Sequence, residues 1–147
     1  MIQSLTTIFE RDLNKLIKEV NTYQNESVLW SFEESISNSA GNLVLHICGN
    51  LQHFIGAVLG NSGYIREREQ EFARKDVSIE DMLKEIETTI EIVRSTLLKL
   101  DVNSLTSNYP INVFKKEMTT EFFLLHLTTH LSYHLGQINY HRRLLDI

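Results

Sequence analysis

The sequence has one cysteine, one proline and six glycines among its 147 residues. With Cys48 as the only cysteine the chain can form no intrachain disulfide, so a reducing cytoplasm is the expected location. Cys48 itself is expected to be a small buried hydrophobic residue. So little proline and glycine argues against a disordered chain and against a fold of many strands and turns.

The sequence also lacks a basic excess and long apolar runs. Its formal net charge of −5 argues against nucleic acid as the main partner, because phosphate contacts need a basic surface. The charged segment 64–75 has mixed signs and is interpreted as a solvated loop with a short helix. Charges near the N-terminus argue against a signal peptide, and no apolar stretch approaches the length of a membrane span. We therefore expect no membrane partner.

Apolar residues at spacings of three and four predict four amphipathic helices within a single domain, residues 1–147. They are expected at about 2–23, 39–59, 78–100 and from 119 or 120 to the C-terminus. Four helices of similar length bury their apolar stripes best as an all-α four-helix bundle. The connection at 60–77 can span up to about 56–61 Å when extended, whereas a helix of 22 residues is about 33 Å long. It can therefore cross the whole bundle, and a simple up-down-up-down order is not required.

The last expected helix holds four of the six histidines in the chain. His126, His130, His134 and His141 follow one another at spacings of four, four and seven residues, and Gln137 lies among them. At about 100° per residue they share one arc at the border of the apolar face. Histidines four apart on one helix can bind a single metal ion.

The four histidines cannot all bind the same ion. His126 and His134 lie about 12 Å apart along a helix, whereas a zinc–nitrogen bond is about 2.0–2.1 Å long. One adjacent pair, 126/130 or 130/134, must therefore be used, and a third ligand must come from another helix. His46 is the better candidate on the second helix, because it borders the apolar arc and His53 lies further from it.

Three segments together resemble the DinB-like superfamily of metalloenzymes, which includes bacillithiol-transferase-like proteins. They are NLVLHICGNLQHFI at 42–55, YIREREQEF at 64–72 and HLSYHLGQINY at 130–140. The resemblance covers most of the chain from Trp30 onward. It implies a four-helix bundle in up-down-down-up order, with a long crossover between the second and third helices.

The resemblance also implies one divalent metal ion, zinc or nickel, held by His46, His130 and His134. His126, His53 and His141 fall outside the motif and are expected to be second-layer or structural residues. Gln137 and Asn50 are expected to orient a ligand or a bound water near the metal. Three histidines leave a zinc site open to water or substrate, as in catalytic rather than structural sites.

The leading functional hypothesis comes from the same resemblance. It is a metal site that activates a low-molecular-weight thiol for S-transfer. A homodimer is expected because the outer face of the last helix carries the small residues Thr129, Ser132 and Gly136, which let another helix approach closely; packing within the chain explains them equally well, and the resemblance favours the dimer. The alternatives are a non-catalytic, stress-related dimeric metal-binding protein and a plain helical interaction module with structural histidines. A di-iron carboxylate site and a zincin protease site are disfavoured, because the chain has neither an ExxH nor an HExxH motif.

Overall fold

The structure is a computed structural model that describes residues 1–147. It contains helices and no strands. The helical segments are α1 (Ile2–Thr22), η1 (Glu26–Trp30), α2 (Ala40–Leu51), η2 (Gln52–Ala57), α3 (Arg68–Ala73), α4 (Ile79–Leu97), α5 (Val102–Thr106) and α6 (Thr120–Leu145). The expected all-α class is confirmed. No helix combines the length and the apolar character that crossing a membrane requires.

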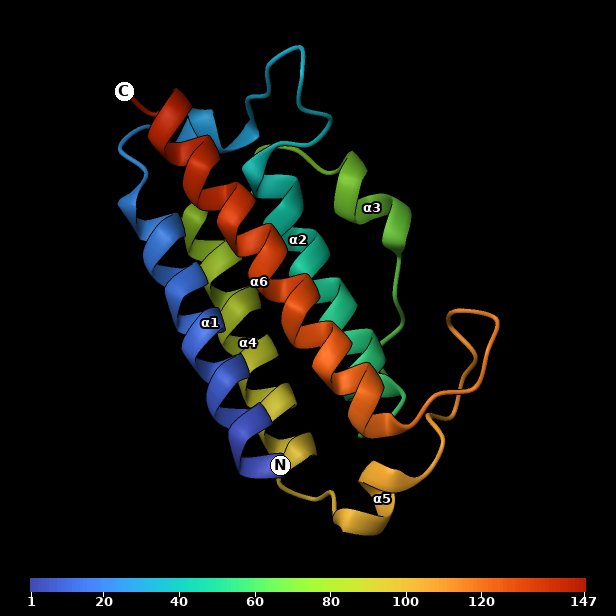
Figure 1. The fold of residues 1–147 in the computed structure, drawn as a ribbon. Helices are drawn as coiled ribbons and strands as arrows, with labels where there is room; N and C mark the ends of the chain where they lie inside the picture. The colour runs from blue at the N-terminus through green and yellow to red at the C-terminus, as the bar shows by residue number, and fades with distance from the viewer.

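The four long helices lie side by side. Helix α1 contacts α4 and α6, and α2 contacts the same two helices from the other side. Figure 1 shows α1 and α6 running in one direction and α2 and α4 running in the other. The connection from α2 to α4 carries the short helix α3, which packs against α2. This arrangement brings the histidines of α2 and α6 to facing surfaces.

Side-chain caps define where three of these helices begin. The hydroxyl of Ser39 accepts a hydrogen bond from the Asn42 amide before α2, and that of Ser78 accepts one from Asp81 before α4. The hydroxyl of Thr119 accepts one from the Phe122 amide before α6. Each cap satisfies a backbone N–H that has no partner within the helix.

The core is formed by the apolar stripes of the four long helices. It includes Leu5, Phe9, Leu13, Leu16, Val44, Ile47, Leu51, Met82, Ile86, Val93, Phe123, Leu124, Leu127, Leu131 and Ile138. Cys48 is fully buried in this core, as expected from its sequence context. Residues just outside the stripes, at the border of the core, are therefore the ones that can face a site between helices.

Three local features differ from the expectations. The predicted second helix changes at Gln52 from an α-helix to a π-helix, which ends at Ala57. The segment 101–118, expected to be a plain connection, contains α5. The segment 64–75 contains the expected short helix, but Glu71 in that helix is buried rather than solvated.

Candidate metal centre

His46 is placed by α2 at the border of the core and is 6% exposed. Its Nδ1 lies 3.0 Å from Oε1 of Glu71 in α3. A carboxylate only accepts hydrogen bonds, so Nδ1 carries the proton and donates the hydrogen bond to Glu71. The other nitrogen, Nε2, therefore presents a lone pair toward α6.

His130 and His134 meet that lone pair from successive turns of α6. Nε2 of His130 lies 3.2 Å from Nε2 of His46 and 3.1 Å from Nε2 of His134. Nδ1 of His134 donates a hydrogen bond of 2.7 Å to the Oε1 carbonyl of Gln137. As in His46, the second nitrogen is therefore left with a lone pair that points into the cluster.

These distances suit a shared cation. The ligand atoms of the three histidines all lie within 4.8 Å of one another. Ligands bound to one zinc ion in a tetrahedron at about 2.0–2.1 Å lie ~3.3 Å apart, close to the two observed separations. His130 can donate a proton to only one of its two neighbours, so one of the two contacts would set lone pair against lone pair. A cation between the three nitrogens removes this conflict.

The surroundings keep two of the rings neutral. Burial, with His134 and His46 nearby, lowers the pKa of His130 to about 3. Burial also lowers the pKa of His134, against the opposing effect of its hydrogen bond to Gln137. Neutral imidazole is the form that binds metal ions. His130 and His134 are therefore in the metal-binding form at neutral pH.

Glu71 is the residue of this centre that the sequence did not single out. Its carboxylate is buried and makes two further hydrogen bonds of 2.9 Å, from Nε and Nη2 of Arg66. Burial alone would raise the pKa of Glu71, but the hydrogen bonds from His46 and Arg66 lower it below its ordinary value. A Cβ atom at Gly49 would overlap this carboxylate, so the missing side chain there makes room for it.

A carboxylate–histidine pair of this kind fixes the ring orientation and raises the basicity of the ligating nitrogen. The mixed charges of segment 64–75 gave no indication that Glu71 accepts the hydrogen bond of His46. The one local signal was Gly49, three residues after His46.

The other candidate residues fall in different places. Gln137 accepts a hydrogen bond from Nδ1 of His134, and Asn50 is buried with its Oδ1 lacking a hydrogen-bond partner. His126 is not part of the three-histidine group; its ring lies 6.5 Å from that of His130 between centroids. His141 binds the Tyr23 hydroxyl and the Ser31 carbonyl, which is a structural role.

Two cavities open on the centre from different sides. The larger, of about 500 Å³, reaches His134 and Gln137 and lies between α6 and the segment 33–38. The smaller, of about 290 Å³, reaches His46 and His130 and lies between α2, α6 and the segments before α3 and α6. The larger volume lies within the range of small-molecule sites, about 300–1,000 Å³, and the smaller lies at its lower limit.

The fold and the site define a class of protein. It is a helical protein with three converging histidines, a carboxylate hydrogen-bonded to one of them, and cavities beside them. The chain belongs to the family described as "Protein of unknown function (DUF1572)", whose model matches residues 2–146. No curated protein matches the chain.

Proposed function

We propose that this chain is a DinB-like metalloprotein whose four long helices form an up-down-down-up bundle around one divalent cation, zinc or nickel. His46, His130 and His134 would be its protein ligands. The observation that carries the proposal is the convergence of three Nε2 atoms at 3.1 and 3.2 Å. Two of those atoms have their lone pairs directed inward by Glu71 and Gln137.

Three protein ligands favour an enzyme, because at least one coordination position stays free for a small molecule. A cation held there would supply Lewis acidity and lower the pKa of a water or thiol bound to it. The proposed reaction is S-transfer with a low-molecular-weight thiol in the cytoplasm. The cavity of about 500 Å³ beside His134 gives such a thiol a route to the centre, and apolar side chains of Leu43 and Leu144 line it.

The first test is the metal content per chain, measured by mass spectrometry on untagged protein never exposed to a nickel column. We expect about one zinc or nickel ion per wild-type chain and little in His130→Ala. His126→Ala is the matched control, since it removes a histidine one turn away that lies outside the group. A chain that is fully helical but carries no metal would contradict the proposal.

The second test addresses the thiol. The protein is loaded with cobalt and titrated with 2-mercaptoethanol, using ethylene glycol as the control that lacks sulfur. We expect a new near-ultraviolet absorption band with the thiol alone, and no band in His130→Ala. Metal binding without any response to thiols would leave the metal proposal standing and reject the thiol.

The outer face of α6 favours a second candidate, a dimeric metal-binding protein without catalysis. That face carries exposed apolar side chains: Phe122, Leu125, Tyr133, Tyr140 and Leu144. Their spacing places them on one side of the helix, and aromatic residues of this kind are enriched in protein interfaces. The two candidates differ in the thiol experiment, because the non-catalytic protein gives no thiol response.

A further inference from the structure

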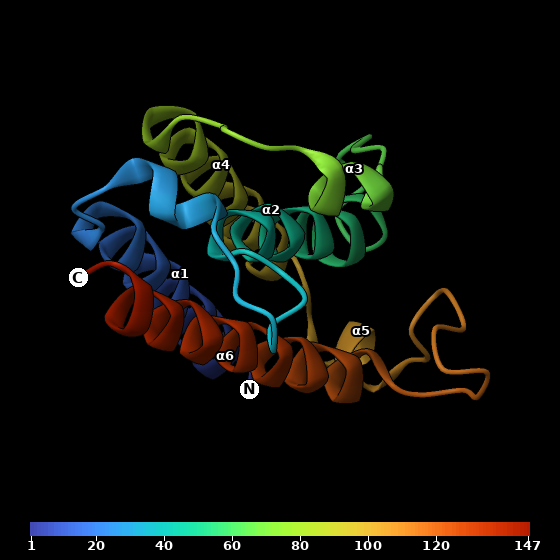
Figure 2. The ribbon, with the colours of Figure 1, turned by 90° about the horizontal axis from the view of Figure 1, so that it is seen from above.

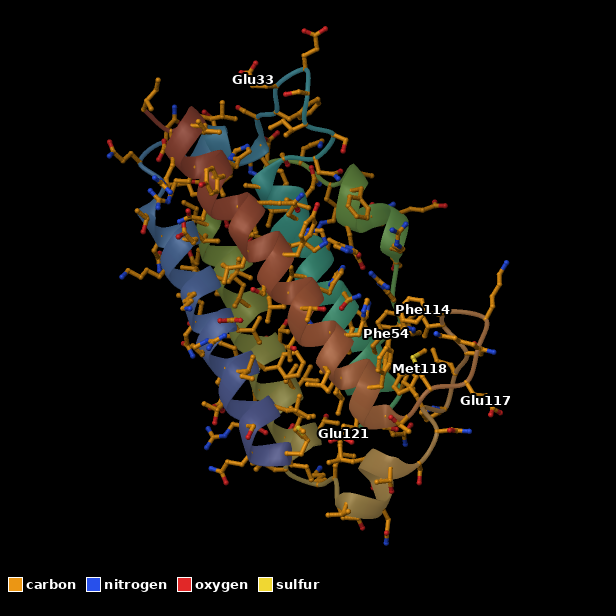
Figure 3. All side chains as sticks on the ribbon, viewed as in Figure 1. Glu33, Phe54, Phe114, Glu117, Met118 and Glu121 are labelled. Atoms are coloured by element: carbon orange, nitrogen blue, oxygen red, sulfur yellow. The ribbon has the colours of Figure 1, made fainter.

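The cavity of about 500 Å³ beside His134 follows the last turns of α6. Its residues on this helix are His134, Gln137, Tyr140, His141, Leu144 and Leu145. From His134 to Leu144 the helix rises about 15 Å, so the cavity is long enough for a chain of several methylene groups. Leu43 of α2 and the segment 33–38 supply the rest of its lining. Figure 3 shows Glu33 in the loop at the end of the bundle where α6 finishes.

The segment 33–38 is held at both ends. Before it, Nε2 of His141 donates a hydrogen bond of 2.6 Å to the Ser31 carbonyl, and Nδ1 of His141 accepts one of 2.8 Å from the Tyr23 hydroxyl. After it, Ser39 caps α2. Within it, the Ile36 amide donates to the carbonyl of residue 33 at 3.0 Å, which closes a turn. The cavity therefore lies between held walls.

Apolar side chains supply much of the surface that a ligand can reach in this cavity. Ile36 is 39% exposed and Leu144 is 67% exposed, and both line the cavity together with Leu43. Single exposed apolar residues are ordinary on a protein surface, whereas apolar residues gathered around one cavity mark a binding site. A ligand with an apolar body would remove these side chains from water.

The cavity offers no cation to an anionic ligand. Glu33 is the only Asp, Glu, Lys or Arg residue among those that line it. The two arginines at this end of α6 are engaged elsewhere: Nε of Arg142 lies 2.7 Å from Oε2 of Glu19, and Arg143 lies over the Tyr140 ring at 5.3 Å from its centroid. A carboxylate or phosphate bound in the cavity would lose water without gaining a partner.

We propose that this cavity selects a thiol whose body is an uncharged, extended apolar chain. The sulfur lies at the His134 end, and the chain packs against Ile36, Leu43 and Leu144. The inference rests on the proposed thiol function and narrows its substrate class, because thiols that carry carboxylate or phosphate groups are poor ligands for such a cavity.

A series of unbranched thiols tests this inference. The cobalt-loaded chain is titrated with 1-propanethiol, 1-butanethiol and 1-pentanethiol, and binding is followed by the near-ultraviolet band. The three probes form the same sulfur–metal bond and differ only in methylene groups, so the metal by itself does not distinguish them. Each buried methylene should tighten binding about fourfold, so pentanethiol should bind about 16-fold more tightly than propanethiol. Equal affinities would overturn the proposal.

A pair of isoleucine variants tests whether the chain-length dependence arises in this cavity. Ile36→Asn removes part of the apolar lining at a partly exposed loop position, so the fold should persist and the ratio of pentanethiol to propanethiol affinity should fall at least about twofold. Ile65→Asn is the same change at an exposed isoleucine outside the cavity and should leave the ratio unchanged. An equal fall in both variants would contradict the proposal.

Ligands without sulfur test the cavity without the metal. The chelator-treated chain is titrated with 1-hexanol and with hexanoate at neutral pH, and amide NMR signals are followed. We expect 1-hexanol to shift signals of the segment 33–38 and of the last turns of α6. Hexanoate should bind at least about tenfold more weakly, because neither a metal nor a basic side chain is present to pair with its carboxylate. Equal binding of the two, or shifts confined to other parts of the chain, would overturn the proposal.

These outcomes separate the inference from the proposed function. A chain without metal, or a cobalt-loaded chain without a thiol band, contradicts the proposed function, and 1-hexanol then decides whether the cavity is an apolar binding site. A thiol band that does not depend on chain length contradicts this inference alone.

Discussion

Glu71 controls the orientation of His46, so it should control metal affinity without touching the metal. Glu71→Gln keeps the shape of the side chain but removes the charge that holds the proton on Nδ1 of His46. Loss of such a partner typically lowers metal affinity about 10- to 100-fold. We expect a decrease of that size in a competition titration against a zinc-binding dye. Glu69→Gln, on an exposed position of the same helix, is the control and should bind as the wild type does; equal weakening in both variants would contradict this role.

His130 makes the stability of the metal-free protein depend on pH. Its pKa in the folded chain is about 3, whereas a histidine in the unfolded chain titrates near about 6.5. Between these pH values the unfolded chain binds a proton that the folded chain does not, so the free energy of unfolding falls as the pH falls from about 6.5 toward 3. Above about 6.5 both states are neutral and this contribution to the pH dependence disappears.

Urea unfolding in the presence of a chelator at pH 7.5 and pH 5.0 measures this effect. The wild type should lose more stability over the interval than His130→Gln, which cannot take up the proton. The same loss in both proteins would show that His130 is not the group responsible.

At the level of elements, α2 and α3 approach closely because Gly49 has no side chain. A Cβ at this position would overlap the Glu71 carboxylate. Gly49→Ala should therefore lower the free energy of unfolding by about 1–3 kcal/mol, the usual cost of overpacking. In a chain that already carries Glu71→Ala, the same substitution should be neutral or stabilising by about 0.5–1 kcal/mol, because alanine is the better helix former. A double-mutant cycle by urea unfolding measures the coupling, and additive effects would argue against the close approach.

The helices that could be predicted from the sequence are those with a strong apolar period. Residues 2–23 were expected to be helical and α1 spans Ile2–Thr22, and α6 begins at Thr120 as expected. The π-helix at Gln52–Ala57 was not predicted, because one extra residue in a turn leaves the apolar pattern of that segment almost unchanged. The short helix α5 has too few residues to show a period.

The candidate site, too, could be predicted from the sequence only in part. The histidine spacing indicated a metal site, but helix geometry left the pairs 126/130 and 130/134 open, and the resemblance chose the second. The structure brings His46 to that pair, which depends on how α2 packs on α6. Glu71 could not be predicted from its charged neighbours, since its burial depends on His46 of α2 and on how its own segment folds to bring Arg66 onto its carboxylate.

For the molecule as a whole, the exposed apolar face of α6 predicts self-association. Gly136 lies on this face, and a Cβ added to it meets no other atom within 4 Å. Gly136→Arg is therefore compatible with the fold of one chain, but it would place a large charged side chain between two copies packed through α6. We expect the wild type to sediment as a dimer and Gly136→Arg as a monomer with unchanged helicity and metal content. Thr88→Arg, a similar change on an exposed position of α4, should remain dimeric.

A wild type that stays monomeric at high concentration, or a Gly136→Arg dimer as stable as the wild type, would exclude α6 as the interface. Because His130 and His134 lie on the same helix as Gly136 but face the core side, a monomeric variant that keeps its metal would also show that each chain holds its own complete site.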